Sequence, residues 1–272
     1  MALTIKTKNI LNKSSYFKIT LLALVMAFGL NTMAQQRKVL NLPNYDQQPY
    51  HFGFILAANI MSFNIKPVDN LSFIKWESDQ SPDIVGVDSL YVYELTSKGT
   101  PGFSIGILGN LRLGKHFDLR FVPALSFGER IINYNILVYD TDDQGAIDSY
   151  FVNVEKSITS TLLEFPLFVK YRSKRLNNFA AYLSGGLKYT LDLASQKQAE
   201  KNLNDVTVKI QKHDLLAEVG VGVDFYTNYF KFGTEIRMGY GINNLIKQEG
   251  NLYTDSIERL GSKIFLLSFT FE

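Results

Sequence analysis

The chain has 272 residues, of which 13% are aromatic and 20% are charged, and its formal net charge is +2. This length fits one all-β domain of barrel size or two small domains, and the near-neutral charge argues against a general nucleic-acid binder. The absence of cysteine excludes disulfides, thiol chemistry and a lipid-modified N-terminal cysteine.

The N-terminus has the three regions of a secretory signal peptide. Four lysines precede the apolar run 19–30, and small residues follow up to Ala34. The run is shorter than the roughly 20 apolar residues of a membrane-spanning helix. We therefore expect residues 1–34 to be a signal peptide that is cleaved between Ala34 and Gln35, which leaves a slightly acidic chain. Residues 35–50 are polar, contain Pro43 and Pro49 and show no periodicity, and they predict an extended arm.

From His51 onward, apolar residues alternate with polar ones, as in strands with one apolar face. The clearest segment is 215–225, where valines and leucines alternate with glycine and acidic residues, and the last segment places Phe265, Leu267, Phe269 and Phe271 on one face. The predicted strands are 51–65, 102–113, 117–134, 158–172, 178–191, 215–225, 229–242 and 263–272.

The connections between these segments are alternately long and short. Outer-membrane barrels have short periplasmic turns and long extracellular loops, and an even number of strands places both termini in the periplasm. We predict an all-β fold over 51–272, an eight-stranded antiparallel transmembrane β-barrel in the outer membrane with both termini periplasmic. The alternative is a soluble barrel of the lipocalin kind, with an apolar interior. The signal peptide, the aromatic strand ends and the glycines beside charges favour a polar interior.

Charged residues fall in mid-strand on the predicted inner face. An eight-stranded barrel is only wide enough to be filled by side chains, so buried charges must pair. We predict a structural network rather than a conduit, built from Arg120, Glu164, Lys188, Glu218, Glu235 and Arg237. Pro123 and Pro166 lie on neighbouring strands and predict a bulged or weakened seam, because proline cannot donate to the ladder.

The sequence has no catalytic constellation. His51, His116 and His213 lie at separate strand ends or turns without the spacing of a nucleophilic triad, so we expect no enzyme and no cofactor. Residues 140–145, which include Asp142, partly match a calcium-binding loop, but the twelfth position is Phe151 instead of the required glutamate. We interpret this stretch as a solvated acidic loop.

The segment Asn41-Leu42-Pro43-Asn44-Tyr45-Asp46, followed by 51–54 and 59–63, resembles the PorT family of Bacteroidetes. These are outer-membrane barrels associated with type IX secretion and gliding motility. The resemblance implies a non-enzymatic accessory of protein export, surrounded by outer-membrane lipid and contacting other secretion-system proteins. The candidate partner contacts are Leu42, Pro43, Asp46, His51 and Trp76. The alternative is a small barrel for adhesion or membrane integrity, whose extracellular loops bind ligands.

Overall fold

The computed structural model describes residues 39–81, 83–141, 145–194 and 208–272. The predicted cleavage site at Ala34 and Gln35, and Asp142 of the acidic stretch, lie outside the described residues. Residues 41–272 form one compact unit. Its strands are β1 (Tyr50–Pro67), β2 (Ser89–Arg112), β3 (Phe117–Phe121), β4 (Ala124–Thr141), β5 (Ile147–Arg172), β6 (Phe179–Asp192), β7 (His213–Tyr226), β8 (Lys231–Gly241) and β9 (Ile257–Phe271).

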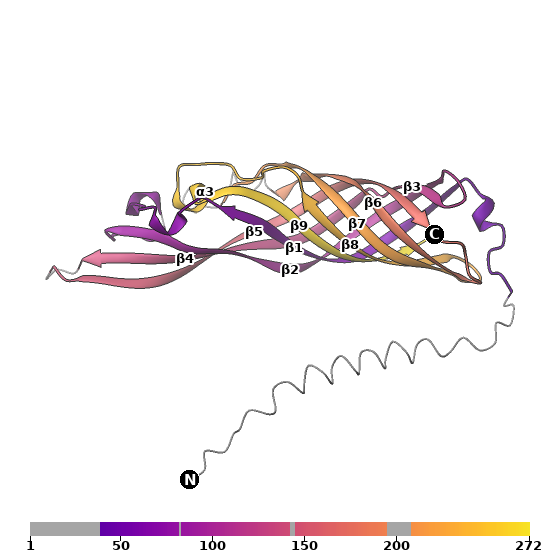
Figure 1. The fold of residues 1–272 in the computed structure, drawn as a ribbon, viewed down its shortest axis with the longest axis horizontal. Helices are drawn as coiled ribbons and strands as arrows, with labels where there is room; N and C mark the ends of the chain where they lie inside the picture. Colours follow the sequence, from indigo (N-terminus) through magenta and orange to yellow (C-terminus); the bar gives the residue numbers. More distant parts are fainter. Residues whose placement is uncertain (1–38, 82, 142–144, 195–207) are drawn as a thin grey trace, which may run out of the picture. The chain divides into compact units, whose positions relative to one another are not determined.

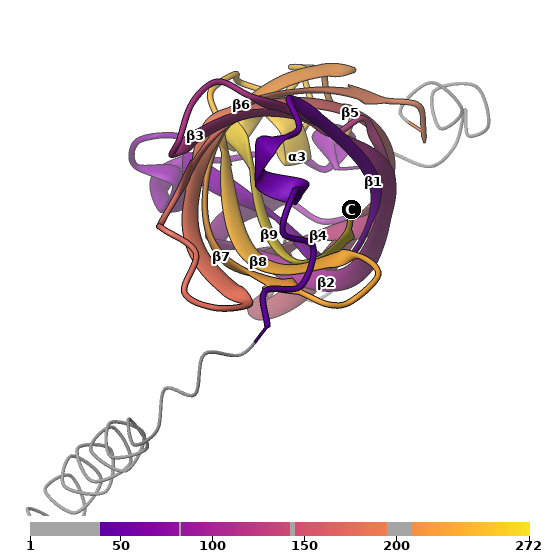
Figure 2. The ribbon, with the colours of Figure 1, turned by 90° about the vertical axis from the view of Figure 1, so that its right-hand side faces the viewer.

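The strands form a closed antiparallel ring (Figures 1 and 2). β1 pairs with both β2 and β9, so that Phe54 lies opposite Ile107 on one side and Phe271 on the other. Closure leaves no edge along the ring, which is the condition for a sheet that crosses lipid. The predicted fold class is confirmed.

β3 and β4 share one position in the ring. Both pair with β2 on one side and with β5 on the other. The interruption falls at Val122 and Pro123, because proline has no N–H to donate to the ladder. The Pro123 carbonyl still accepts the Ile107 amide at 3.0 Å. Pro166 stays within β5, so of the two prolines only Pro123 interrupts a strand, and the ring has eight strand positions.

The ring is apolar outside and polar inside. On β1, Phe52 is exposed whereas Asn59 is buried, and on β9, Phe265 is exposed whereas Ser268 is buried. A soluble barrel with an apolar interior has the reverse polarity. The structure therefore excludes the lipocalin-type alternative.

The second predicted long loop is a hairpin of paired strand. β4 and β5 remain paired as far as Thr141 and Ile147, where the sequence suggested a loop over 135–157. β2 also begins earlier than expected and pairs with β4 from Ser89. Beyond the last pairings of β1 at Thr100 and of β6 at Leu162, residues 89–96, 133–141 and 147–155 form a three-stranded sheet, here called the projecting sheet (Figure 1).

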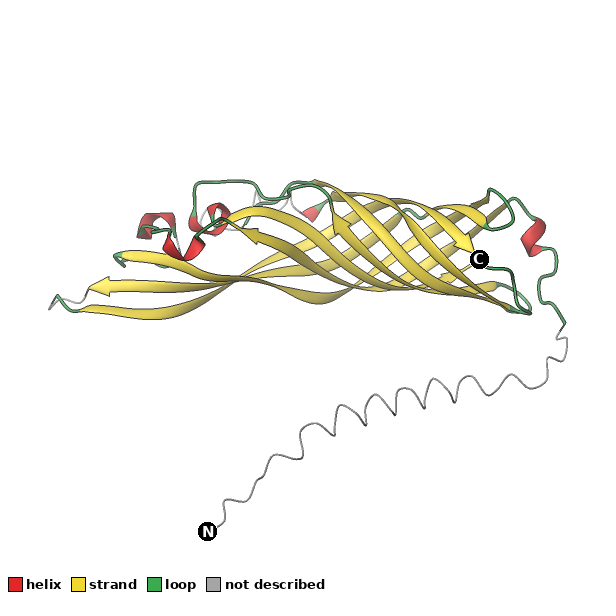
Figure 3. Ribbon diagram, viewed as in Figure 1, coloured by secondary structure: helices red, strands yellow, loops and turns green. Residues whose placement is uncertain are grey.

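An apolar cluster fills the long-loop end of the ring. The inward side chains of β4 are apolar here and pack against residues of the loops. Short helical turns position these loop residues, namely η2 (Leu71–Phe73), η3 (Ser78–Gln80) and α3 (Leu252–Asp255) (Figure 3). Within the described ranges, no helix is long and apolar enough to cross a membrane. The cluster, here called the loop-end core, includes Leu71, Trp76, Ile84, Ile132, Tyr134, Ile136, Val138, Leu245, Leu252 and Tyr253.

Candidate functional site

A series of ion pairs occupies the middle of the barrel. Lys188 Nζ lies 3.1 Å from Glu164 Oε1 and 2.6 Å from Glu218 Oε1. Arg237 then links Glu218 to Glu235, with nitrogen-to-oxygen distances of 3.6 and 2.9 Å. All five side chains are buried. Each charge therefore has a partner of opposite sign that offsets part of its desolvation.

Arg120 extends this series toward the end of the barrel that carries the short turns. Its guanidinium lies 3.6 Å from Glu235 Oε2 and 2.7 Å from Glu272 Oε1. Lys231 Nζ lies 2.6 Å from the other oxygen of the Glu272 side chain. The structure thus brings all six predicted lumen charges together, in one series that runs from Glu164 to Lys231.

Several members of the buried network were not among the predicted site residues. Lys170 Nζ lies 2.6 Å from Asp224 Oδ2 and 3.5 Å from the centre of the Tyr182 ring. A Cβ atom at position 222 would overlap that ring, so Gly222 provides the space for it. Lys170 and Asp224 occupy polar positions in the alternating pattern, so the sequence could have identified them as inward-facing charges. Glu272 is the last residue, where the alternating pattern does not indicate which way the side chain points.

The arm folds into the mouth of the barrel instead of extending away from it. Residues 41–48 contain the short helix η1 (Tyr45–Gln47), and Figure 2 shows this indigo segment lying across the opening. The Asn41 amide N–H donates to Asn178 Oδ1 at 2.9 Å, and its side-chain amide donates to the Tyr226 carbonyl at 3.0 Å. Arg175 donates to the carbonyls of Asn41 and Leu42. The backbone of the arm is therefore tied to the short turns.

Asp46 is the main charged contact of the arm. Its carboxylate accepts a hydrogen bond from Arg172 and another, at 3.1 Å, from the Tyr226 hydroxyl. Arg112 and Arg175 approach it at 3.9 and 3.8 Å. Burial acts to raise the pKa of Asp46, but the hydrogen bond and the charge of Arg172 outweigh it and hold the pKa below its ordinary value.

Tyr45 connects the arm to the buried ion pairs. Its ring stacks on His51, with centroids 3.8 Å apart and an interplanar angle of 14°. Its hydroxyl donates to Glu272 Oε2 at 3.1 Å, and His51 Nε2 lies 2.9 Å from the Tyr45 carbonyl oxygen. The side chain thereby closes the short-turn end of the interior.

The other candidate partner contacts lie in different surroundings. Leu42 is half-buried with a positive φ of 48°, and Pro43, the next residue of the arm, is exposed. Trp76 is only 7% exposed, because it packs in the loop-end core and pairs with Leu90 through an isolated β-bridge. Of the five candidates, Pro43 is the one that offers an exposed side chain.

Comparison with known proteins identifies the class of barrel. The sequence pattern of a family described as "Outer membrane protein beta-barrel domain" matches residues 33–247. The chain belongs to this family. Among solved structures, this outer-membrane barrel is similar to Neisserial surface protein A, with 13% identity, a TM-score of 0.38 and coverage of 82% of this chain and 99% of the other. It is also similar to OprG from Pseudomonas aeruginosa, with 11% identity, a TM-score of 0.32 and coverage of 80% and 93%. No curated protein matches.

The histidines of this outer-membrane barrel lie apart from one another. His116 Nδ1 contacts the Arg172 carbonyl at 3.0 Å, and His213 Nδ1 contacts the Tyr189 hydroxyl at 2.6 Å. His51 contacts the arm. Within the described part of the chain, no group of three histidine, aspartate or glutamate side chains is arranged to hold a metal ion.

Proposed function

We propose that this outer-membrane barrel is a closed, non-enzymatic accessory of protein export of the type IX kind, and that it acts through its two ends. The observation that supports action through the two ends is the filled interior. The loop-end core occupies one end, the ion pairs from Glu164 to Lys231 occupy the middle, and the arm occupies the other end. A barrel without an open path can serve export by contacting other proteins.

The orientation follows the general rule for such barrels. The first strand begins and the last strand ends at the same end, where Phe54 pairs with Phe271. Short turns of outer-membrane barrels face the periplasm, so we place the arm in the periplasm and the projecting sheet outside the cell. The export role itself rests on the resemblance of residues 41–46, 51–54 and 59–63 to the PorT family.

A second candidate is adhesion, and the projecting sheet favours it. The sheet extends paired strand beyond the ring on the side of the long loops, and it exposes Tyr93, Tyr150, Phe151 and Ile147. A barrel that only maintained the membrane would not require this extension. Ligands at the cell surface are the partners that such an element can reach.

Deletion of the gene distinguishes the two functions. The export role predicts that secreted proteins accumulate in the periplasm, whereas adhesion predicts normal secretion and loss of surface binding. Complementation with a chain that lacks residues 36–44, and with one in which Asp46→Ala releases the arm, tests the periplasmic end. Heat-modifiable gel mobility confirms that each barrel is folded. Normal secretion in the deletion strain would contradict the export role.

A further inference from the structure

The outer face of the projecting sheet changes character along its length. Near the ring, the outward residues of β2 and β4 are apolar, with Phe103 stacked on Phe127 at 4.9 Å. A polar band follows, and aromatic residues reappear near the tip at Tyr91 and Tyr139. Because polar side chains separate the two apolar regions, the tip does not continue the lipid-facing surface. Its aromatic rings are therefore available to another ligand.

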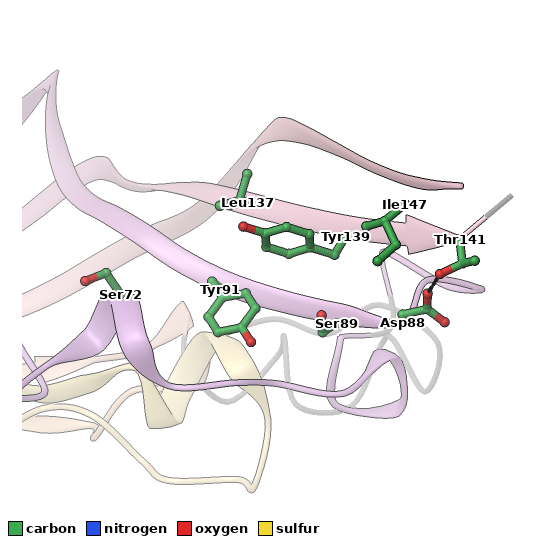
Figure 4. Close-up of a pocket in the computed structure, with 8 residues that line it drawn as sticks. All are labelled: Ser72, Asp88, Ser89, Tyr91, Leu137, Tyr139, Thr141 and Ile147. Carbon is green, nitrogen blue, oxygen red and sulfur yellow. Dashed lines mark hydrogen bonds between the residues drawn. The ribbon is translucent and has the colours of Figure 1, made fainter. Parts of the chain in front are cut away.

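The tip carries an open cleft of about 370 Å³ (Figure 4). The rings of Tyr91 and Tyr139 meet at 83° with centroids 5.7 Å apart, so they form two walls of a corner. At one side of the cleft, the Thr141 hydroxyl donates to Asp88. The rest of the lining comes from Ser72, Ser89, Leu137 and Ile147. The cleft thus combines aromatic faces with a carboxylate and hydroxyl groups.

A second groove of about 330 Å³ continues along the same face, and it is lined by polar side chains. Among the residues the structure describes, the side-chain oxygens of Asn133 and Asn135 accept no hydrogen bond although they are covered. Covered amide oxygens usually have a partner in the protein or in a bound molecule. Glu94 and Glu155 also line the groove. Neither carboxylate makes an ion pair within the described ranges.

The two clefts are neighbours on one strand pair. Tyr91 lies opposite Leu137, and Glu94 lies opposite Asn135 two residues farther along β4. An elongated ligand that lay along β2 and β4 would therefore contact the tyrosine corner first and the amide groove next. Unpaired carboxylates repel anions, which excludes phosphate groups and acidic chains as ligands.

We propose that the outer face of the projecting sheet binds an uncharged oligosaccharide. A sugar has C–H faces that pack on aromatic rings, and hydroxyl groups that both donate and accept hydrogen bonds. Tyr91 and Tyr139 provide the rings, while Asn133, Asn135 and Glu155 provide acceptors and donors. A purely apolar ligand would leave these amides without partners. The inference goes beyond the export role and does not depend on it.

Calorimetric titration of the purified, detergent-solubilised barrel tests this proposal. The probes are soluble hexose and N-acetylhexosamine hexamers, and the uncharged fraction of the delipidated polysaccharide of the bacterium's own outer membrane. We expect saturable binding to at least one probe. Binding of the bacterial polysaccharide alone would assign the ligand to the cell's own surface, and binding of a soluble hexamer would assign it to an external glycan.

Variants locate the binding. Tyr139→Ala and Asn135→Leu are expected to weaken binding by roughly tenfold or more, whereas Tyr139→Phe keeps the ring and most of the affinity. Tyr229→Ala is the matched control, because Tyr229 is 89% exposed at the opposite end of the barrel. Heat-modifiable mobility verifies folding of each variant. The proposal is overturned if the folded wild type binds no probe, if Tyr139→Ala and Asn135→Leu leave the affinity unchanged, or if the face captures a protein instead.

Discussion

Glu218 is one of the buried carboxylates that link two cations, because it contacts both Lys188 and Arg237. Glu218→Leu would leave those cations with less compensation in a buried site. We expect a loss of roughly 3–5 kcal/mol in the free energy of unfolding. The midpoint of urea unfolding, followed by heat-modifiable gel mobility, measures the change.

The control for this variant is an exposed ion pair. Glu258 lies 2.6 Å from Lys66 on the surface, where solvent screens the interaction. Glu258→Leu should leave the unfolding midpoint close to that of the wild type. Equal effects of the two variants would show that the buried series has no special role in stability.

The interaction between Asp46 and Arg172 sets a lower pH limit for binding of the arm in the mouth of the barrel. The pKa of Asp46 is held below the ordinary value, so the arm is fully stabilised above the ordinary carboxyl range of about 4. The stabilisation is lost as the pH falls through the lowered pKa, because protonation removes the interaction with Arg172. A fluorophore on the exposed Gln47 should therefore report that the arm stays bound in the barrel mouth from neutral pH to about pH 4. Release of the arm is expected only below that pH.

The matched variant for this measurement is Asp46→Asn. It removes the charge and keeps the size of the side chain, so the pH dependence should disappear and the arm should be more mobile at neutral pH. Release of the wild-type arm near pH 6 would instead assign the titration to another group.

At the scale of elements, the projecting sheet should be separable from the ring. Its strands pair among themselves beyond Thr100 and Leu162. Replacing residues 138–150 by an Asn-Gly turn, which favours a tight hairpin, should shorten the sheet and leave insertion and heat-modifiable mobility intact. Failure of this shortened chain to fold would show that the hairpin is needed for assembly of the barrel.

The alternating pattern predicted the strands wherever one face meets lipid. The predicted segment 215–225 corresponds to β7 (His213–Tyr226). The same reasoning failed for 135–157, because the inward residues there are apolar. Ile136 and Val138 pack in the loop-end core, whereas Asn133 and Asn135 face outward. The polarity of the faces is thus reversed beyond the ring, and the acidic residues near Asp140 further suggested a loop.

The contacts of the arm could not be predicted from local sequence. Asp46 meets Arg172, which is far along the chain, and Tyr45 meets the last residue, Glu272. Two prolines and the absence of periodicity indicated an arm without strand, and among the described residues 39–49 none lies in a strand. They carry no information about which distant side chains lie at the same end of a closed ring.

For the whole molecule, closure of the interior depends on three groups of residues from different parts of the chain: the arm, the buried ion pairs and the loop-end core. Removing the arm exposes one end, but the ion pairs around Arg237 and the loop-end core remain in place. A barrel of eight strand positions has an interior that side chains can fill. We therefore expect the interior to stay closed even when the arm is absent.

Single-channel recording in planar bilayers tests this central claim most directly. The purified barrel, and a variant that lacks residues 36–48, are inserted into the same lipid and compared with a known porin. We predict that neither protein gives a large, stable conductance. A steady open-channel current from the wild-type barrel would contradict the filled interior and, with it, a function that operates only through the two ends.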